Sequence, residues 1–366
     1  MSDALKIENA LLHELGGQLA PAKWAQSVQK LSDLYLDNPD AISPWEEIWA
    51  REALLSYFHP LNQSRAGRAA EKGRELGFFE DLRHAIDLGC GSGAGALGFL
   101  EQHRFDSLLL ADHSSVITDL ARRVVENSGL APENLSSSRE SLRGFKPTEI
   151  RPGTLLILSY VLTETLSNTE IESLLAKLPS LEAIAILEPS TSDDGRRLQS
   201  LRPILKRAGF NIWAPCTHEG ECPLQKDSDR DWCHDRLFPK LPSWWPALEA
   251  GLPMKNRTVT VSYLLARRKP RPSRLSSNEL VRVIGDRLEE KTKVRQMICR
   301  GENREFISWF PSRLKGAAKD FRLARGDLFN SEDDFWKDPR GIERSKEFRL
   351  DLPAIEAINE TKSPRD

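Results

Sequence analysis

The feature that most constrains the fold of this chain is a series of short apolar runs that alternate with helical patterns from residue 84 onward. Such runs are typical of strands buried on both faces of a parallel sheet. A later run alternates apolar and polar residues, as a strand with one buried face does. The sequence therefore predicts an α/β fold, with a Rossmann-like doubly wound sheet over residues 81–268, built on the runs 84–88, 107–112, 154–160, 183–188 and 257–266.

Four further regions lie beside or within this predicted domain. Residues 1–80 are rich in Ala, Leu, Glu and Arg at helical spacing and predict a helical N-terminal region. Residues 214–250 form a polar, Cys-rich insertion before the last strand. Short strand-like pieces in 269–327 predict a small basic β module, for which an OB-like form is one option. Residues 328–366 are expected to be a polar tail.

A glycine-rich loop follows the first predicted strand and opens a helix, in the pattern Asp87-Leu-Gly89-Cys-Gly91-Ser-Gly93. A second acid, Asp112, ends the next strand, where an acid commonly holds ribose hydroxyls. The loop resembles the S-adenosylmethionine motif of class I methyltransferases. That resemblance implies that the three glycines line the methionine part, Asp87 lies near its ammonium, and Asp112 binds the ribose. The alternative is a Rossmann-like domain that keeps the loop only for helix–strand packing.

The end of the predicted strand 154–160 should face the transferred methyl group, and it carries Ser159 and Tyr160. We include Ser159 among the cofactor-binding residues. The segment is not of the Asn/Asp-Pro-Pro-Tyr type that holds a base amino group. Glu164 is a candidate general base, but a Glu that starts a helix is more often a capping group. The sequence thus identifies no catalytic residue and leaves enzymatic activity open.

Four cysteines outside the glycine loop are predicted metal ligands: Cys216, Cys222, Cys233 and Cys299. Clustered cysteines in a reducing compartment more often bind metal than form disulfides. Their spacing lacks the Cys-x2-Cys or Cys-x4-Cys pair that holds a zinc ribbon. Four thiolates, the last from another domain, suit a 4Fe-4S cluster, and zinc remains the alternative. His218 and His234 are substitute ligands if one cysteine is spare.

The cysteine segment also carries a family resemblance. Its pattern resembles the methyltransferase-like small-ribosomal-subunit assembly family of bacteria and mitochondria, through Ala214-Pro-Cys216-Thr-His218-Glu-Gly-Glu-Cys222-Pro, Asp231-Trp-Cys233-His234, Leu158–Glu164 and Leu187–Thr191. The resemblance covers roughly residues 30–330. It implies a methionine-cofactor pocket, an iron–sulfur cluster on the four cysteines and association with small-subunit rRNA, in an assembly role more than in catalysis. Thr217 replaces the usual Pro, and Asp235 stands where an aromatic residue often follows.

Charge is unevenly distributed in this chain, whose overall formal charge is −2. Residues 267–325 hold 17 Lys/Arg against 7 Asp/Glu, a net charge of +10. A basic segment of this kind is a candidate nucleic-acid surface, and a solvated surface of mixed charge is the alternative. We predict rRNA contacts at Lys291, Lys293 and Arg295. The start of the chain lacks the pattern of a secretory signal, and no apolar run is long enough to span a membrane, so we expect a cytoplasmic monomer.

Three functions compete at this point. The first is a ribosome-assembly factor that binds rRNA or the ribosomal particle, with S-adenosylmethionine and a 4Fe-4S cluster as cofactors. The second is an active rRNA methyltransferase. The third is a small-molecule methyltransferase with a structural zinc, which needs a capacious apolar pocket and no RNA affinity.

Overall fold

The structure is a computed structural model that describes residues 2–38, 41–145, 150–162, 167–272, 280–313 and 323–330. Glu164, the candidate base, and residues 331–366 of the predicted tail lie outside the described residues.

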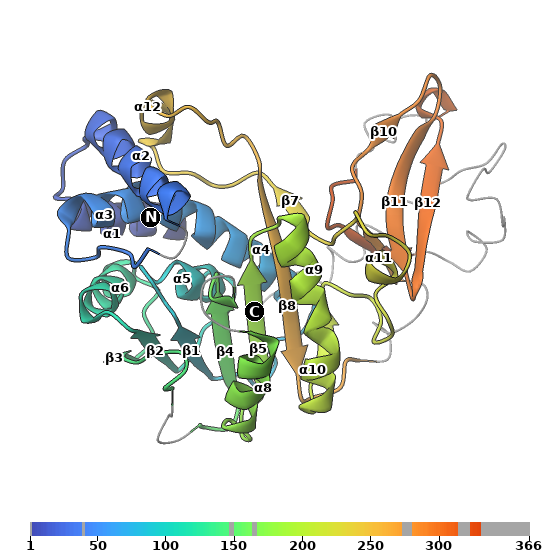
Figure 1. Cartoon of the computed structure of the whole chain (residues 1–366), viewed down its shortest axis with the longest axis horizontal. Helices are drawn as coiled ribbons and strands as arrows, with labels where there is room; N and C mark the ends of the chain where they lie inside the picture. The colour runs from blue at the N-terminus through green and yellow to red at the C-terminus, as the bar shows by residue number, and fades with distance from the viewer. Residues whose placement is uncertain are drawn as a thin grey trace.

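The centre of the molecule is one large sheet (Figure 1). Its described strands are β1 (His84–Leu88), β2 (Ser107–Asp112), β3 (Asn134–Arg139), β4 (Thr154–Ser159), β5 (Ala183–Glu188), β6 (Asn211–Ala214), β7 (Asp235–Leu237) and β8 (Val259–Arg267). Their order is β3-β2-β1-β4-β5-β8-β6, with β7 paired to β8. The first five strands are parallel neighbours, so the predicted Rossmann-like sheet is confirmed.

One strand departs from the predicted parallel arrangement. β8 pairs antiparallel with β5 on one side and with β6 on the other. The physical reason lies in the connection before it. β6 runs parallel to β5 and ends at the carboxyl edge of the sheet. The Cys-rich insertion that follows returns the chain to this same edge. β8 therefore starts there and runs in the opposite direction.

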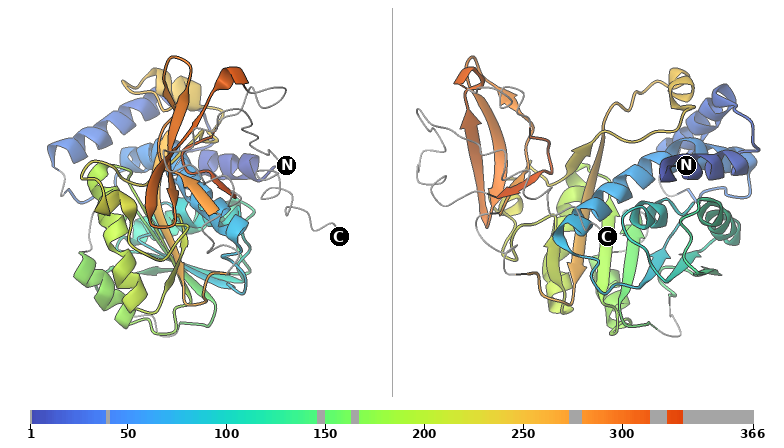
Figure 2. Two further views of the ribbon diagram at one scale, coloured as in Figure 1. Left: turned by 90° about the vertical axis from the view of Figure 1, so that its right-hand side faces the viewer. Right: turned by 180° about the vertical axis from the view of Figure 1, so that it is seen from behind.

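Helices cover both faces of this sheet (Figure 2). One face carries α4 (His59–Leu76), α5 (Ala94–Leu100) and α6 (Ser115–Asn127), and the other carries α8 (Asn168–Ala176), α9 (Ser192–Ser200) and α10 (Arg202–Arg207). Alternate residues of β4 enter the two cores, Leu155 and Ile157 on one side and Leu156 and Leu158 on the other. This division follows from the two-residue period of a strand.

The helical segment that follows β5 is split into α9 and α10. The break falls at Leu201, and Pro203 lies in the first turn of α10. Proline lacks a backbone N–H and its ring blocks the carbonyl four residues earlier, so a continuous helix through this position is disfavoured.

The N-terminal region is helical, as predicted. It contains α1 (Asp3–Glu14), α2 (Pro21–Asp37), α3 (Ile48–Ala53) and a π-helical turn, η1 (Leu54–Phe58), that leads directly into α4. These helices pack on α12 (Trp245–Ala250) of the insertion. The contact is aromatic: Trp24 meets Trp244 edge-on at 5.6 Å between ring centroids, and Tyr57 stacks on Trp245 at 5.0 Å.

A second, antiparallel sheet lies beside β7 and α11 (Pro223–Lys226) (Figures 1 and 2). It contains β9 (Leu280–Val283), β10 (Leu288–Glu289), β11 (Val294–Arg300), β12 (Asn303–Trp309) and β13 (Leu328–Asn330), with the short helix η3 (Pro311–Arg313) after β12. β13 pairs with β9, so the sheet extends three residues past the predicted boundary at 327. Among the described residues no pairing closes this sheet into a barrel, so the OB-like option is not supported.

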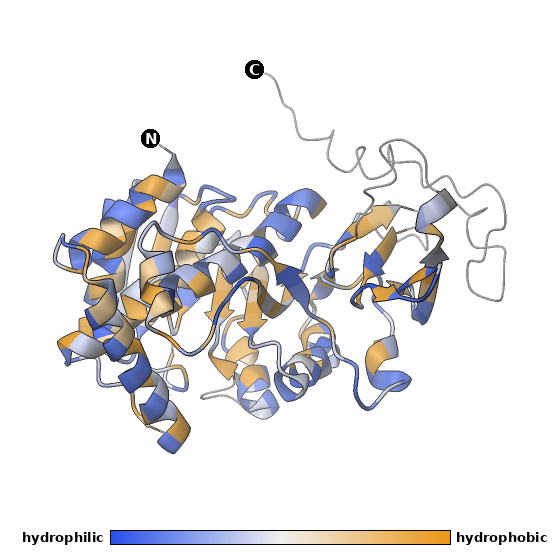
Figure 3. Cartoon of the chain, turned by 90° about the horizontal axis from the view of Figure 1, so that it is seen from above, coloured by the Kyte–Doolittle hydropathy of each residue, from blue (hydrophilic) through white to orange (hydrophobic). Residues whose placement is uncertain are grey.

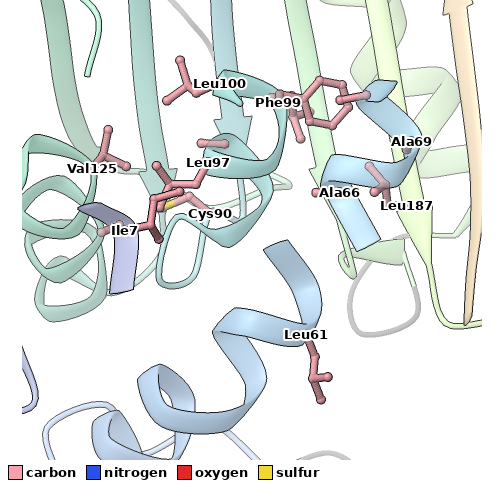
Figure 4. Packing of buried hydrophobic residues seen from close by; sticks show 14 of the residues in the cluster. Ile7, Leu61, Ala66, Ala69, Cys90, Leu97, Phe99, Leu100, Val125 and Leu187 are labelled. Atoms are coloured by element: carbon pink, nitrogen blue, oxygen red, sulfur yellow. The ribbon is translucent and has the colours of Figure 1, made fainter. Parts of the chain in front are cut away.

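Hydrophobic residues concentrate on the strands of the large sheet and on the helix faces turned toward it (Figure 3). Cys90 belongs to this core. Its sulfur lies with Ile7, Leu97 and Val125 beneath the N-terminal helices (Figure 4). Cys90 therefore serves packing, away from the other four cysteines. Within the described part of the chain, no helix combines the length and apolarity that crossing a membrane requires.

Candidate functional site

The glycine loop joins β1 to α5 at the carboxyl edge of the parallel strands. Gly89, Gly91 and Gly93 all have positive φ angles, of 77°, 50° and 80°. Side-chain-bearing residues rarely adopt this conformation. A Cβ atom on Gly89 would also lie 2.7 Å from Cγ2 of Val161, in the loop after β4. The sequence pattern thus corresponds to a tight loop whose backbone conformation favours glycine at these three positions.

Asp87 lies beneath this loop and is fully buried. Its Oδ2 accepts a hydrogen bond from the Ala96 backbone N–H at 2.9 Å, whereas Oδ1 is buried without a partner among the described residues. Burial raises the pKa of the Asp87 carboxyl to about 7, and the neighbouring Asp112 adds to the rise. A buried carboxylate oxygen without a donor is suited to a cationic ligand group.

Asp112, at the end of β2, holds the glycine loop from the other side. Its Oδ2 accepts from the Gly91 backbone N–H at 3.1 Å, and its Oδ1 lies 2.8 Å from His113 Nδ1. Ser159, at the end of β4, lies near Asp87. Both residues border Gly95 of α5: a Cβ atom added to this glycine would lie 3.2 Å from Asp87 Oδ2 and 3.2 Å from Ser159 Cβ. All six predicted cofactor residues thus lie together at one edge, and their binding roles stay predictions.

Glu188, at the end of β5, is a component of this edge that our sequence interpretation missed. It is buried, and its Oε1 accepts from the backbone N–H groups of Val161 and Leu162 at 3.2 and 2.8 Å. The carboxylate thereby fixes the turn after β4, where Tyr160 has the unusual φ of 62°. The available signal was an acid at the end of an apolar strand, the same signal that marked Asp87 and Asp112.

The four predicted metal ligands are all buried, and three of them pack together where the insertion meets the small sheet. Cys222, Cys233 and Cys299 pack in one cluster with Leu224 and Ile284. Burial raises the pKa of the Cys299 thiol well above its usual value, and the neighbouring Cys216, Cys233 and Cys222 thiols raise it further. We call these four thiols and their surroundings the cysteine pocket. Cys299 of β11 thus lies beside Cys222 and Cys233 of the insertion, the neighbours that we predicted for it.

The two candidate substitute ligands lie beside the cysteine pocket. His218 Nε2 is 3.9 Å from Cys299 Sγ, and burial lowers the pKa of His218 to about 4. His234 follows Cys233, its ring lies against Trp232, and burial lowers its pKa to about 3. Both imidazoles are therefore neutral at pH 7 and able to donate one hydrogen bond each.

Arginine side chains surround the cysteine pocket. Each of the four interacts electrostatically with at least one of its thiols: Arg202, Arg271, Arg282 and Arg325. The Nε atom of every one is buried without a hydrogen-bond partner among the described residues. An unsatisfied buried donor costs about 1–3 kcal/mol, so four of them on arginines near the thiols fit a site that holds an anionic group.

The four thiols are not arranged as a preformed metal site. In the described ranges, no group of three or more His, Cys, Asp or Glu side chains is placed to hold a metal ion. Tetrahedral zinc requires sulfurs at about 2.3 Å from one common centre, and an iron–sulfur cluster requires one thiolate at each iron corner. The structure therefore shows neither centre, and the cluster and the zinc alternative both stay predictions.

A buried ionic network joins the small sheet to the large domain next to this pocket. Asp235 is fully buried and forms ion pairs with Arg282 of β9 and with Arg68 of α4, the latter at 2.9 Å. Burial alone would raise the pKa of Asp235, but Arg282 and Arg68 outweigh it, and the pKa is lowered. Asp235 stands where an aromatic residue often follows in the family pattern, and here its carboxylate is paired with two arginines. Gly326 is also required here, because a Cβ atom on it would lie 2.2 Å from Asp235.

The predicted rRNA-binding residues lie on one hairpin of the small sheet. Lys291 is exposed in the turn between β10 and β11, whereas Lys293 and Arg295 are half-buried. Arg295 pairs with Glu290 at 3.4 Å and lies over the Phe306 ring. Much of the segment's positive charge is paired internally, including Arg267, Arg282, Arg300, Arg304 and Arg325. The net charge of +10 therefore overstates the positive charge that is exposed.

Comparison with known families identifies the chain. A family profile described as mitochondrial small ribosomal subunit Rsm22 matches residues 79–326, or 248 of the 366 residues. This chain belongs to the Rsm22 family. The matched span contains the glycine loop and all four cysteines of the pocket, and the family predicted from the sequence is confirmed. The Rsm22 description is mitochondrial, so it does not confirm the cytoplasmic location that we expected.

Solved structures similar to this Rsm22-family chain include two methyltransferases. Magnesium protoporphyrin IX methyltransferase from Synechocystis PCC 6803, solved with bound SAM, is 13% identical; the match covers 56% of this chain and 80% of that one, with a TM-score of 0.34. TrmK of M. capricolum, in complex with S-adenosyl-homocysteine, is 10% identical, with 62% and 71% covered and a TM-score of 0.34. Comparison with curated proteins gave no match.

Proposed function

We propose that this Rsm22-family chain is a methyltransferase-like, rRNA-binding protein of small-subunit assembly. In this proposal the cysteine pocket holds a 4Fe-4S cluster, and the edge formed by β1, β2 and β4 binds S-adenosylmethionine. The observation that carries the proposal is the pocket itself. Thiols from two parts of the chain pack together in a buried site, beside arginines whose Nε–H groups have no acceptor among the described residues.

The residues of the pocket fit an anionic cluster. Burial raises the pKa of Cys216, Cys222 and Cys299, so these thiols are protonated in the absence of a metal centre. Metal ligation requires thiolates, and the surrounding guanidinium groups favour that form. A cubane cluster takes one cysteine at each of its four iron corners and, when bound, supplies a rigid link between the insertion and β11. We prefer it to zinc because the cysteine spacing lacks the Cys-x2-Cys or Cys-x4-Cys pair that is usual in zinc sites.

The cofactor edge favours a ligand with a cationic group next to Asp87, and this has a consequence for pH dependence. Only the ionised Asp87 attracts an ammonium group, and its pKa in the free protein is about 7. The affinity for S-adenosylhomocysteine should therefore rise as the pH increases from about 5.5 to about 7.5, approaching tenfold per unit at the acidic end. Titration calorimetry across this range measures the slope. Asp87→Asn should flatten it, whereas Asp106→Asn, an exposed acid paired with Arg83, should leave it unchanged. An identical slope in wild type and Asp87→Asn would contradict this role.

The rRNA contact is tested by charge reversal on the β10–β11 hairpin. Changing Lys291, Lys293 and Arg295 together to Glu should weaken binding to small-subunit rRNA. The slope of log K against log salt should also shrink, by about one for each phosphate that the variant no longer neutralises. Filter binding at several salt concentrations measures both quantities. The matched control reverses three exposed arginines of the large domain, each of which also has an acidic partner: Arg83, Arg122 and Arg143. Equal reductions in the two triple variants would move the rRNA surface away from the hairpin.

The competing functions remain distinguishable by assay. An active rRNA methyltransferase would transfer a labelled methyl group to small-subunit particles, and the proposed assembly role requires only binding. A small-molecule methyltransferase with structural zinc would show no salt-dependent affinity for rRNA. The paired charges of the basic segment lower its electrostatic contribution, but the exposed hairpin turn keeps rRNA binding the favoured proposal.

A further inference from the structure

Helix α9 lies between the cofactor edge and the cysteine pocket. It begins four residues after Glu188, packs on β5 and β8, and is capped by Thr191, whose side chain accepts from the Asp194 backbone N–H. Adjacent residues on an α-helix project about 100° apart, so neighbouring side chains can reach two different sites. Arg196 and Arg197 do so.

Arg196 holds the segment that connects two of the cysteines. Its guanidinium donates from one nitrogen to the carbonyl oxygens of Ser228 and Asp231, at 2.8 and 2.9 Å, and to that of Leu224 at 3.3 Å. In return, Gln225 Nε2 donates to the Arg196 carbonyl at 2.6 Å. The chain from Cys222 to Cys233 is thus folded around one side chain of α9. One turn further on, Gln199 Oε1 lies 3.7 Å from Cys216 Sγ.

Arg197 supports the opposite site. Its guanidinium donates to the Leu162 carbonyl oxygen at 2.7 Å. Leu162 and Val161 form the turn after β4 that Glu188 also holds, and Val161 packs directly on Gly89 of the glycine loop. A shift of α9 would therefore move the wall of the cofactor edge.

Trp232 provides a second connection between the two sites. Its indole N–H donates to the Ser190 carbonyl oxygen at 2.7 Å, just before α9, and it directly precedes the ligand Cys233. Its ring lies so close to the helix that a Cβ atom on Gly195 would be 2.7 Å from it. Only glycine fits this position, so the start of α9 and the residue beside Cys233 are packed as one unit.

We propose that Arg196 and Arg197 are positioning residues through which α9 couples the two sites, so that filling the cysteine pocket strengthens binding of an S-adenosyl ligand at the cofactor edge. The proposal rests on the proposed function. The physical reason is that Arg196 of α9 holds the 222–233 segment, which carries two of the proposed ligands, while Arg197 of the same helix holds the turn that packs on the glycine loop. Coupling of this kind is reciprocal, so the S-adenosyl ligand should equally slow the loss of iron.

The test uses the full chain, loaded with iron and sulfide or depleted by a chelator. We expect S-adenosylhomocysteine to bind at least about fivefold more tightly to the loaded protein, as measured by calorimetry. Arg196→Met keeps the apolar stem but removes the three hydrogen bonds to carbonyl oxygens, and it should reduce this ratio toward one. Arg207→Met is the matched control, because Arg207 lies on α10 and its guanidinium pairs with the exposed Glu172. That variant should keep the full ratio.

A second variant tests the coupling in case Arg196→Met does not fold. Trp232→Phe removes the hydrogen bond to Ser190 and shortens the side chain by one ring but keeps an aromatic ring at this position, so it should fold, lower the ratio and speed iron release to a chelator in the presence of S-adenosylhomocysteine. Equal affinity in the loaded and depleted wild-type protein would overturn the coupling and leave the proposed function intact. Failure to bind iron, or S-adenosylhomocysteine in either form, would overturn the proposed function and the coupling with it.

Discussion

Replacing Cys233 with alanine is expected to lower the iron content of the protein and its melting temperature by at least about 10 °C. Cys233 lies at the centre of the cysteine pocket: its carbonyl accepts from Ser262 Oγ of β8, and its thiol interacts with Arg282 of β9. Its loss removes one corner of the cluster and leaves Arg282 and Arg325 without their thiolate. Because metal binding of this type is coupled to folding, the stability loss should exceed that of an ordinary core truncation.

The matched control is Cys90→Ala, which deletes the same atom from a buried cysteine of the hydrophobic core. It should cost about 1 kcal/mol and leave the iron content unchanged. Metal analysis and thermal unfolding of both variants make the comparison. If Cys233→Ala and Cys90→Ala unfolded at the same temperature, the pocket would contribute nothing special to stability, and the cross-linking role would be wrong.

Asp235→Asn is expected to destabilise the protein by about 3–5 kcal/mol without removing iron, because it leaves two buried arginines facing a neutral amide. Arg282 and Arg68 both pair with this carboxylate, one from the small sheet and one from α4. The pKa of Asp235 is lowered in the folded state. Its contribution is therefore fully present above the unfolded pKa of about 3.9 and is lost as the pH falls through the lower folded value.

The control for this variant is Asp231→Asn, whose partner Arg304 is only partly buried. A pair of that kind contributes about 0–1 kcal/mol. Urea unfolding of the two variants at pH 7, with iron determined in parallel, separates the effects. Equal stability of Asp235→Asn and Asp231→Asn would show that the ionic network does not hold the small sheet in place.

Much of the fold could be predicted from the sequence because local patterns determine it. The strands 84–88, 107–112 and 183–188 are so uniformly apolar that both their faces had to be buried, and the structure has them at the same bounds. The direction of β8 could not be predicted in this way. It depends on the edge of the sheet at which the Cys-rich insertion returns the chain, which is a tertiary property.

The residues of the candidate site were likewise predictable only in part. Asp87 and the three glycines were identified because a strand, a tight loop and a helix are contiguous in the chain. Cys299 was assigned to the same ligand set as Cys233 only through spacing and residue type, although 65 residues separate the two. Glu188 and Arg197 were missed because their role is to hold backbone atoms of a distant turn, which leaves no local pattern. The basic segment was overestimated because net charge does not show that Arg282 and Arg304 are paired with acids far away in sequence.

The most direct test of the central claim is the iron and sulfide content of the protein purified without oxygen. The cysteine pocket predicts about four irons and about four acid-labile sulfides per chain, with broad visible absorption that disappears on exposure to a chelator. Cys90→Ala should keep these values, and Cys233→Ala should not. Stoichiometric zinc with no iron, or no metal in the pocket at all, would contradict the assignment of a 4Fe-4S cluster to these cysteines.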